Sequence, residues 1–235
     1  MLNKLKTLYN KSPLFIKKIY GIIPNKIKYG REYRKWNHVI KENKELKRSP
    51  FITLKFALKN FQFYKDFYKN INIDEWHNIP LLDKETIQKK LSEFKKSKES
   101  KLYVSTGGVT GKPAKFYQSN NVWYKEMAFV YNYYESQGYK SPNLKASFRG
   151  ADFSNLKEDE YWEFNPHHFE INFSPFHINE HTVEKYIQKL NELQPKFFHG
   201  YPSAFLSLAK CMKICNLKLN YTPHCFFLIS EGYTN

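Results

Sequence analysis

The pattern that most restricts the fold of this chain lies in residues 196–230. A short apolar strand is predicted at 196–199, followed by the turn Gly200-Tyr201-Pro202, a helix over 203–215 and a second strand over 225–230. Two strands joined by one helix form a β-α-β unit, in which the strands run parallel and the crossover is right-handed. The predicted fold class is therefore α/β, with a parallel or mixed sheet that contains this unit.

Helical patterns dominate the N-terminal half. Residues 31–48 are helical in composition, and apolar side chains then recur at three- and four-residue steps, which predicts one apolar helical face. These side chains are Leu54, Leu58, Phe61, Tyr64 and Tyr68. Asp83 is the predicted N-cap of a further helix that runs through Ile87 and Leu91.

Strands and helices alternate after residue 101. A short strand is predicted at 102–104, a helix at 122–137 ending near Gly138, short strands between 146 and 178, and a helix at 183–193 before Pro195. The charged stretch 95–101 is the most linker-like part of the chain. We therefore expect a basic, mainly helical N-terminal region at 1–100 and an α/β nucleotide-binding portion at 101–235.

The large net charge of the chain says little about its binding partners. The formal net charge is +16, but 34 of the 38 basic residues are lysines. Residues 1–118 hold 27 basic and 10 acidic residues, whereas residues 119–235 hold 11 and 12. Arginine, the side chain suited to phosphate and base contacts, is scarce, so nucleic-acid binding is disfavoured. A solvated basic surface is favoured over an anionic partner or a membrane surface, and the latter remain open alternatives.

Composition also restricts the environment of the chain. Its 41% hydrophobic and 18% aromatic content excludes wholesale disorder, and three cysteines are too few for a disulfide framework. A reducing cytoplasm is expected. Near the N-terminus, Lys17 and Lys18 interrupt the apolar runs, so a signal peptide is disfavoured. Packing onto the rest of the fold is favoured there over a basic amphipathic helix resting on a membrane surface.

A glycine- and hydroxyl-rich loop, residues 105–113, follows the strand at 102–104. It reads Ser-Thr-Gly-Gly-Val-Thr-Gly-Lys-Pro. Its glycines permit close backbone approach, its N–H groups can form an anion-binding nest, and Lys112 adds positive charge. This combination suits a nucleotide triphosphate. Thr106 and Pro113 stand where a Walker A loop requires glycine and a hydroxyl residue, and the glycine spacing is wrong for a dinucleotide fingerprint.

The loop resembles the phosphate-binding signature of adenylate-forming (acyl-AMP) enzymes, which ends in Gly-Lys-Pro. The chain is similar in particular to the phenylacetate–CoA ligase branch and related capsular-polysaccharide-biosynthesis proteins. Four further segments carry this resemblance in order: 78–87 (NIPLLDKETI), 173–178 (FSPFHI), 199–204 (HGYPSA) and 229–232 (ISEG). The resemblance implies that the chain is the N-terminal large-domain portion of such an enzyme.

The family activity implies a set of site residues. Such enzymes join a carboxylate to ATP, with magnesium, and pass the acyl group to a thiol, amine or hydroxyl acceptor. The resemblance assigns the phosphates to Ser105, Thr106, Gly107, Gly108, Thr110, Gly111 and Lys112. It assigns the border of the acyl pocket to His199, Gly200, Tyr201, Pro202 and Ser203, and the neighbourhood of the adenine to Ser230 and Glu231. No residue is assigned as catalytic, and no metal ligand is identified.

Two departures from the family pattern indicate a loss of activity. Val109 stands where the family has serine or threonine, and the chain stops at Asn235, before the family's Tyr-Gly-x-x-Glu segment and its distal catalytic lysine. We therefore expect a truncated protein that does not catalyse full ligation alone. The alternative is a non-catalytic remnant that binds nucleotide or an anionic surface. The histidines 167, 168, 177 and 181 are expected to be structural, because no ligand spacing for a metal is completed.

Overall fold

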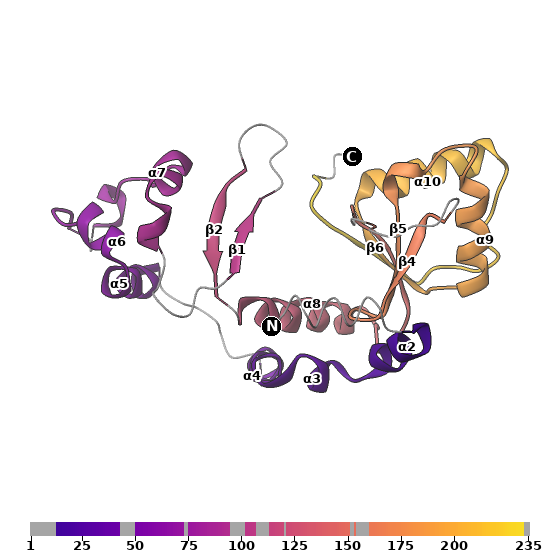
Figure 1. Ribbon diagram of the computed structural model, residues 1–235, viewed down its shortest axis with the longest axis horizontal. Helices are drawn as coiled ribbons and strands as arrows, with labels where there is room; N and C mark the ends of the chain where they lie inside the picture. Colours follow the sequence, from indigo (N-terminus) through magenta and orange to yellow (C-terminus); the bar gives the residue numbers. More distant parts are fainter. Residues whose placement is uncertain are drawn as a thin grey trace. The chain divides into compact units, whose positions relative to one another are not determined.

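The computed structural model describes residues 13–42, 50–72, 75–94, 102–106, 113–119, 121–150, 153 and 160–232 (Figure 1). The chain forms two compact units. Unit 1 comprises Met1–Gly30 and Val130–Asn235, and unit 2 comprises Arg31–Phe129. Residues 95–101 lie outside the described residues, so the division expected at residue 100 stays a prediction.

Unit 1 is built on a five-stranded mixed sheet. Its strands are β3 (Lys145–Phe148), β4 (Trp162–Asn165), β5 (Glu170–Phe173), β6 (Phe197–Gly200) and β7 (Cys225–Leu228). The spatial order is β4-β5-β3-β6-β7; β4 pairs antiparallel with β5, and the other neighbours are parallel. The predicted α/β class, mixed sheet and β-α-β unit are confirmed.

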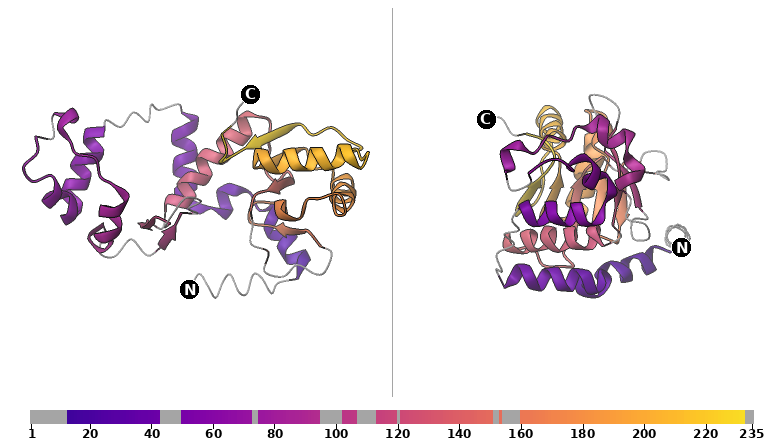
Figure 2. Two further views of the ribbon diagram at one scale, coloured as in Figure 1. Left: turned by 90° about the horizontal axis from the view of Figure 1, so that it is seen from above. Right: turned by 90° about the vertical axis from the view of Figure 1, so that its left-hand side faces the viewer.

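Helices α9 (Val183–Leu193) and α10 (Pro202–Ile214) cover one face of this sheet, and Figure 2 shows α10 running alongside β7. Alternate strand residues point to this face, as the period of two requires, and Phe148, Phe173 and Phe198 are almost completely buried there. Ala204 and Leu208 of α10 complete the core, with Cys211 and Cys215 packed against it. The predicted helix over 203–215 is therefore confirmed, and it buries one apolar face.

The opposite face of the sheet buries polar side chains. Lys145 and Glu170 are each only 1% exposed, and His199 is 7% exposed. Aromatic residues around the end of α8 (Val122–Ser136) cover them: Tyr134 stacks on Phe227 with ring centroids 4.1 Å apart, and Tyr139 receives a hydrogen bond from Lys145 Nζ at 3.2 Å. On this face, the buried charged side chains therefore contact tyrosine rings and not aliphatic side chains.

The N-terminal helices α2 (Leu14–Ile22) and α3 (Asn25–Lys28) pack on the turn between β4 and β5. The Tyr20 hydroxyl hydrogen-bonds with Nδ1 of His167 at 3.0 Å, and Lys28 Nζ donates to the His167 carbonyl at 3.2 Å. A methyl group on Gly21 would meet the Phe169 ring at 2.6 Å, so glycine permits this close approach. Packing onto the fold is confirmed for α2 and α3, whereas residues 1–12 lie outside the described residues.

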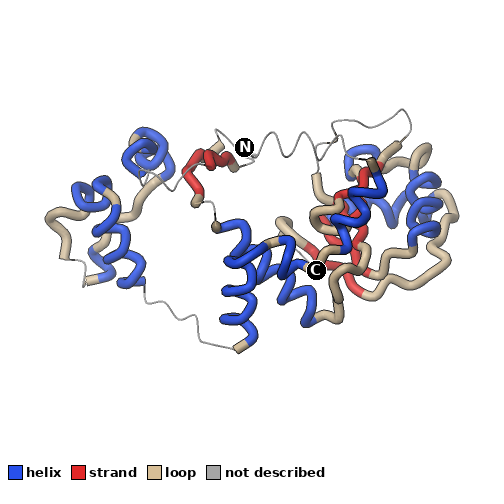
Figure 3. Tube along the Cα trace, turned by 60° about the horizontal axis from the view of Figure 1, so that its bottom comes forward, coloured by secondary structure: helices blue, strands red, loops and turns tan. Residues whose placement is uncertain are grey.

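Unit 2 contains short helices, a hairpin and an aromatic cluster. Its elements are α4 (Gly30–Lys41), α5 (Pro50–Asn60), α6 (Gln62–Phe67), η1 (Trp76–Asn78), α7 (Lys84–Lys89), η2 (Leu91–Phe94), β1 (Leu102–Ser105), β2 (Lys115–Gln118) and the first part of α8; Figure 3 distinguishes helices from strands. Phe63 and Phe94 have ring centroids 4.3 Å apart at the centre of the cluster.

Two sequence expectations for unit 2 can be compared with its structure. Asp83 caps α7 as predicted, because its carboxylate accepts the Thr86 N–H at 2.6 Å. The single apolar helical face expected over 54–68 is instead divided at Phe61, which is extended (φ −128°, ψ 126°). The Asn60 side chain donates to the Phe56 carbonyl at 2.7 Å and so satisfies one of the acceptors that α5 leaves at its end.

No helix among the described residues is both long enough and apolar enough to cross a membrane.

Candidate functional site

The base of the glycine-rich loop lies in unit 2, between the antiparallel strands β1 and β2. Thr106 closes it: its N–H donates to the Ala114 carbonyl at 2.9 Å, and its Oγ1 accepts the Ala114 N–H at 3.0 Å. Ser105 is exposed and pairs with Lys115 in the hairpin register. The structure thus places Ser105 and Thr106 at the base of the loop. Gly107, Gly108, Thr110, Gly111 and Lys112 lie outside the described residues.

Gln88 of α7 supports this loop base, which sequence reasoning missed. Its Nε2 donates to the Lys115 carbonyl at 2.8 Å, and its Oε1 accepts the Lys115 N–H at 3.0 Å. The side-chain amide therefore pairs with the edge of β2 as a neighbouring strand would. The segment 78–87, which carries part of the family resemblance, leads directly to this contact. The only sequence signal was a glutamine on the first turns of a capped helix.

The remaining site residues lie in unit 1, at the carboxyl edge of its parallel strands. Because β3, β6 and β7 run parallel in adjacent positions, their carboxyl ends share one edge of the sheet. Gly200 is the last residue of β6, Ser203 lies in the first turn of α10, and the Ser230–Glu231 segment follows β7. Ligands of open α/β sheets bind at such an edge. The structure thus brings together the two motifs that the sequence placed 28 residues apart.

Ser203 and Glu231 make the direct contact between these motifs. The Glu231 carboxylate accepts the Ser203 backbone N–H at 2.8 Å and the Ser203 hydroxyl at 2.6 Å. Both hydrogen bonds lower the pKa of Glu231. Tyr201, the N-cap residue of α10, makes no side-chain cap. Glu231, from the segment that follows β7, supplies the anionic group that a helix N-terminus favours.

The backbone around Ser230 directs Glu231 to that position. Ser230 adopts a left-handed conformation with φ 63°, which is uncommon for a residue with a side chain. The N–H of Ile229 still donates to the Gly200 carbonyl at 3.1 Å, so the ladder between β6 and β7 continues up to this point. The turn at Ser230 then ends the strand. Its strain is stored at the candidate site, as is typical of functional segments.

Gly200 permits the closest approach in this region. A methyl group there would lie 2.5 Å from the carbonyl oxygen of Phe148 and 2.8 Å from its carbonyl carbon. The adjoining residue Tyr201 donates its N–H to the same oxygen at 3.2 Å. The glycine is therefore needed for the close pairing of β3 with β6, independently of any ligand.

Two further residues, Phe176 and Gly150, lie near this edge. Phe176 is 77% exposed, although it is a large aromatic residue. It lies beside Gly150, since a methyl group on Gly150 would be 3.3 Å from the Phe176 ring and 3.9 Å from the Tyr201 ring. The rings of Phe176 and Tyr201 thus both lie near Gly150. Phe176 belongs to the segment 173–178, which carries part of the family resemblance.

His199 lies in the interior and not at the edge. Its ring is 5.7 Å from that of Tyr134, on the polar face of the sheet. Burial, aided by the Arg149 charge, lowers the pKa of His199 to about 4. His199 is therefore neutral at physiological pH. The sequence grouped His199 with residues 200–203 at the acyl pocket, and that role stays a prediction.

The low pKa of His199 predicts acid sensitivity. Between pH 6.5 and 4 the unfolded chain binds a proton that the folded chain does not, so stability is retained above pH 6.5 and lost as pH falls. The expected loss from this residue is about 3 kcal/mol at pH 4. Urea unfolding at stepped pH would show a flatter dependence in His199→Asn than in the parent protein. His77→Asn, at an exposed site, is the matched control for the substitution itself, and equal slopes in all three proteins would contradict the prediction.

The histidines and cysteines form no metal centre in the described part of the chain. His167 and His168 contact Tyr20 and Tyr29, and burial lowers the pKa of each histidine. Cys211, Cys215 and Cys225 are free thiols. The expected structural role of the histidines at 167 and 168 agrees with these contacts.

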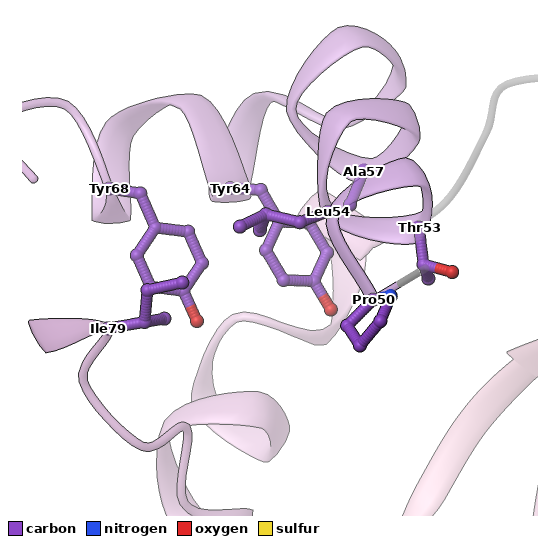
Figure 4. Close-up of a pocket in the computed structure, with 7 residues that line it drawn as sticks. All are labelled: Pro50, Thr53, Leu54, Ala57, Tyr64, Tyr68 and Ile79. Atoms are coloured by element: carbon purple, nitrogen blue, oxygen red, sulfur yellow. The ribbon is translucent and has the colours of Figure 1, made fainter. Parts of the chain in front are cut away.

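A separate cavity of about 360 Å³ lies within unit 2. It is lined by Pro50, Thr53, Leu54, Ala57, Tyr64, Tyr68 and Ile79. Figure 4 shows the rings of Tyr64 and Tyr68 side by side; their centroids are 6.1 Å apart. No charged side chain lines this cavity, so it suits an apolar group and not a phosphate.

The fold is similar to that of a solved acyl-CoA ligase. An open-conformation crystal structure of 2-hydroxyisobutyryl-CoA ligase, in complex with 2-HIB-AMP and CoA, matches 70% of this chain and 41% of its own. The TM-score is 0.50 and the identity 13%. The same ligase in its thioesterification state matches 83% of this chain and 42% of its own, with TM-score 0.47 and 14% identity. The first comparison shows that the chain has the α/β fold of an adenylate-forming ligase.

The sequence comparison points to a narrower branch. Protein CapK of Staphylococcus aureus is 25% identical over 251 residues, which cover 98% of this chain and 56% of CapK. The chain therefore spans about half the length of the curated relative it matches. No family model matches it. Together, the sequence and the fold confirm the resemblance to the CapK-like branch of adenylate-forming enzymes, over part of such a protein.

Proposed function

We propose that the chain is part of an ATP-dependent ligase that joins a small-molecule carboxylate to AMP and releases pyrophosphate. A thiol, amine or hydroxyl would then accept the acyl group. The observation that carries the proposal is the Ser203–Glu231 contact, which unites two family motifs at the carboxyl edge of a ligase-like sheet. From the family resemblance, a cytoplasmic role in capsule or surface polysaccharide biosynthesis follows as part of the proposal.

The proposed chemistry depends on positioning and on charge stabilisation. The loop residues Ser105, Thr106, Gly107, Gly108, Thr110, Gly111 and Lys112 would hold the β- and γ-phosphates. Backbone N–H groups, hydroxyls and one ammonium group suit those oxygens. Magnesium, when bound, would neutralise phosphate charge. In this proposal Gly200–Ser203 border the acyl group, and Ser230 and Glu231 lie near the adenine.

The Ser203–Glu231 contact suggests a specific role for the Glu231 carboxylate. It holds the first turn of α10 in place and so fixes the border formed by Tyr201 and Ser203. His199, whose ring is buried and neutral, would support this border from inside the sheet without touching substrate. Its backbone pairs with Ser147, which anchors the strand that leads into the turn.

ATP binding by the 235-residue chain tests the proposal. Titration with a fluorescent ATP analogue should saturate, and Lys112→Ala should weaken binding about tenfold, because a charge-assisted contact to phosphate contributes about 1.5–3 kcal/mol. Lys69→Ala, which removes an exposed lysine of the same unit, is the matched control and should bind as the parent does. Absence of saturable binding, or equal affinity in both variants, would contradict the proposed loop role.

Pyrophosphate exchange separates the ligase from the alternative. A non-catalytic remnant would bind nucleotide or an anionic surface without exchanging ATP with pyrophosphate. We expect no exchange from the 235-residue chain alone. Exchange in a longer protein that continues this chain, lost on Lys112→Ala, would favour the ligase; nucleotide binding without exchange in that protein would favour the remnant.

A further inference from the structure

Helices α2 and α3 present apolar side chains to solvent. Phe15 is 63% exposed, Ile19 58%, Ile22 54% and Ile27 68%. Phe15, Ile19 and Ile22 recur at steps of four and three, so they share one face of α2. Surface helices of globular proteins normally turn such a face toward the core. Here the apolar face is on the outside.

The orientation of α2 is fixed by contacts on its other side. Tyr20 hydrogen-bonds with His167, and Gly21 lies against the Phe169 ring. Lys28 Nζ reinforces this attachment, since it donates to the Gly21 carbonyl at 3.0 Å and to the His167 carbonyl at 3.2 Å. The helix would have to leave the β4–β5 turn before it could bury Phe15 and Ile19 against unit 1.

The same segment carries only positive charge. Residues 1–31 contain eight lysines and arginines, and the first acidic residue of the chain is Glu32. Lys18 and Lys26 are exposed on α2 and α3 themselves. The exposed apolar face therefore lies within a basic segment that no acidic side chain of its own neutralises.

We propose that α2 and α3 rest on an anionic lipid bilayer, with Phe15, Ile19, Ile22 and Ile27 inserted at the interface. Apolar side chains flanked by lysines are the features that such interfacial helices require, because acyl chains accept the former and acidic head groups the latter. A second copy of the chain is a poorer occupant, since like-charged segments would then face each other. This inference does not depend on nucleotide binding or on ligase activity.

Vesicle sedimentation tests the apolar contribution. The 235-residue chain should bind vesicles of phosphatidylglycerol and phosphatidylcholine at ~0.1 M salt, and should bind pure phosphatidylcholine vesicles at least tenfold more weakly. Phe15→Ser/Ile19→Ser should reduce binding to anionic vesicles about tenfold or more. Leu206→Ser/Ile214→Ser, whose residues on α10 are 56% and 63% exposed, is the matched control and should bind as the parent does. Thermal unfolding of each variant checks that the fold is retained.

A charge-reversal pair tests the electrostatic contribution. Lys18→Glu/Lys26→Glu should weaken anionic-vesicle binding and its salt dependence, whereas Lys210→Glu/Lys213→Glu on α10 should have little effect. The proposal is overturned if the parent does not bind anionic vesicles, or if the α2–α3 variants bind as well as their α10 controls. It is also overturned if Phe15→Ser/Ile19→Ser changes the oligomeric state in solution and leaves vesicle binding intact.

Discussion

Gly200→Ala should destabilise unit 1 by about 3 kcal/mol or more, at the upper end of the range for overpacking substitutions. The added methyl group would lie 2.5 Å from the Phe148 carbonyl oxygen and 2.9 Å from the Phe148 Cβ. These atoms belong to the neighbouring strand and cannot rotate away as the tip of a side chain can. Strands β3 and β6 would have to separate where Phe148 pairs with Gly200. Since domains are stable by only about 5–15 kcal/mol, the variant should lose much of its folded population on mild heating.

Two other glycines supply graded controls for this prediction. A methyl group on Gly232 would have no neighbour within 4 Å, so Gly232→Ala should leave the free energy of unfolding nearly unchanged. Gly150→Ala would place a methyl group 3.3 Å from the tip of the exposed Phe176 ring, which can move, and should cost little. Urea unfolding followed by circular dichroism gives the order. A Gly200→Ala protein as stable as Gly232→Ala would show that the two strands separate without cost.

Local sequence patterns predicted the carboxyl-terminal elements well. The strand–turn–helix–strand order of residues 196–230 depends on short apolar runs, Pro202 at the first turn of α10 and the loop that follows it, all of which act over a few residues. The contact between Ser203 and Glu231 spans 28 residues, and the family resemblance grouped these motifs without indicating that they touch. The left-handed backbone at Ser230 precedes Glu231 and directs it toward Ser203. The sequence does not indicate this conformation, because glycine is the residue that usually adopts it.

Elements that depend on tertiary contacts were less predictable. Strand β2 is too short for its hydrophobic pattern to indicate the hairpin. The backbone N–H and carbonyl of Lys115 at its edge are hydrogen-bonded by the distant Gln88 side chain, which no local pattern predicts. The division at Phe61 interrupts a helical period that the sequence continues on both sides. The polar face of the sheet was missed for a similar reason. Lys145 and Glu170 appear as charged strand residues that would normally face solvent, yet both are 1% exposed. The rings of Tyr131, Tyr134 and Tyr139 lie over Lys145 only once the chain has folded.

Glu170→Gln should destabilise unit 1 by about 3 kcal/mol, because the buried Lys145 ammonium loses the one negative charge that lies near it among the described residues of this face. The loss comes mainly from Lys145, since the ion-paired Arg149 side chain is 36% exposed. The Glu170 carboxylate is 1% exposed, accepts from Arg149 Nη2 at 2.9 Å and from Asn165 Nδ2 at 3.1 Å. Burial already lowers the pKa of Lys145 to about 8, and the charge of Glu170 opposes that effect. Without this charge, the pKa of Lys145 should fall further, and the Arg149 guanidinium loses its ionic partner.

A double-mutant cycle separates this buried charge from the general effect of substitution. Lys145→Met in the Glu170→Gln background removes the second buried charge, so the combined loss of stability should be smaller than the sum of the single losses. Glu192→Gln breaks a surface pair whose carboxylate is 62% exposed, 2.8 Å from Lys189 Nζ, and should change the free energy of unfolding by less than about 1 kcal/mol. Strict additivity of the two buried substitutions would contradict electrostatic coupling across this face. A loss in Glu170→Gln no larger than in Glu192→Gln would show that the buried carboxylate contributes nothing beyond what a neutral amide of the same shape supplies.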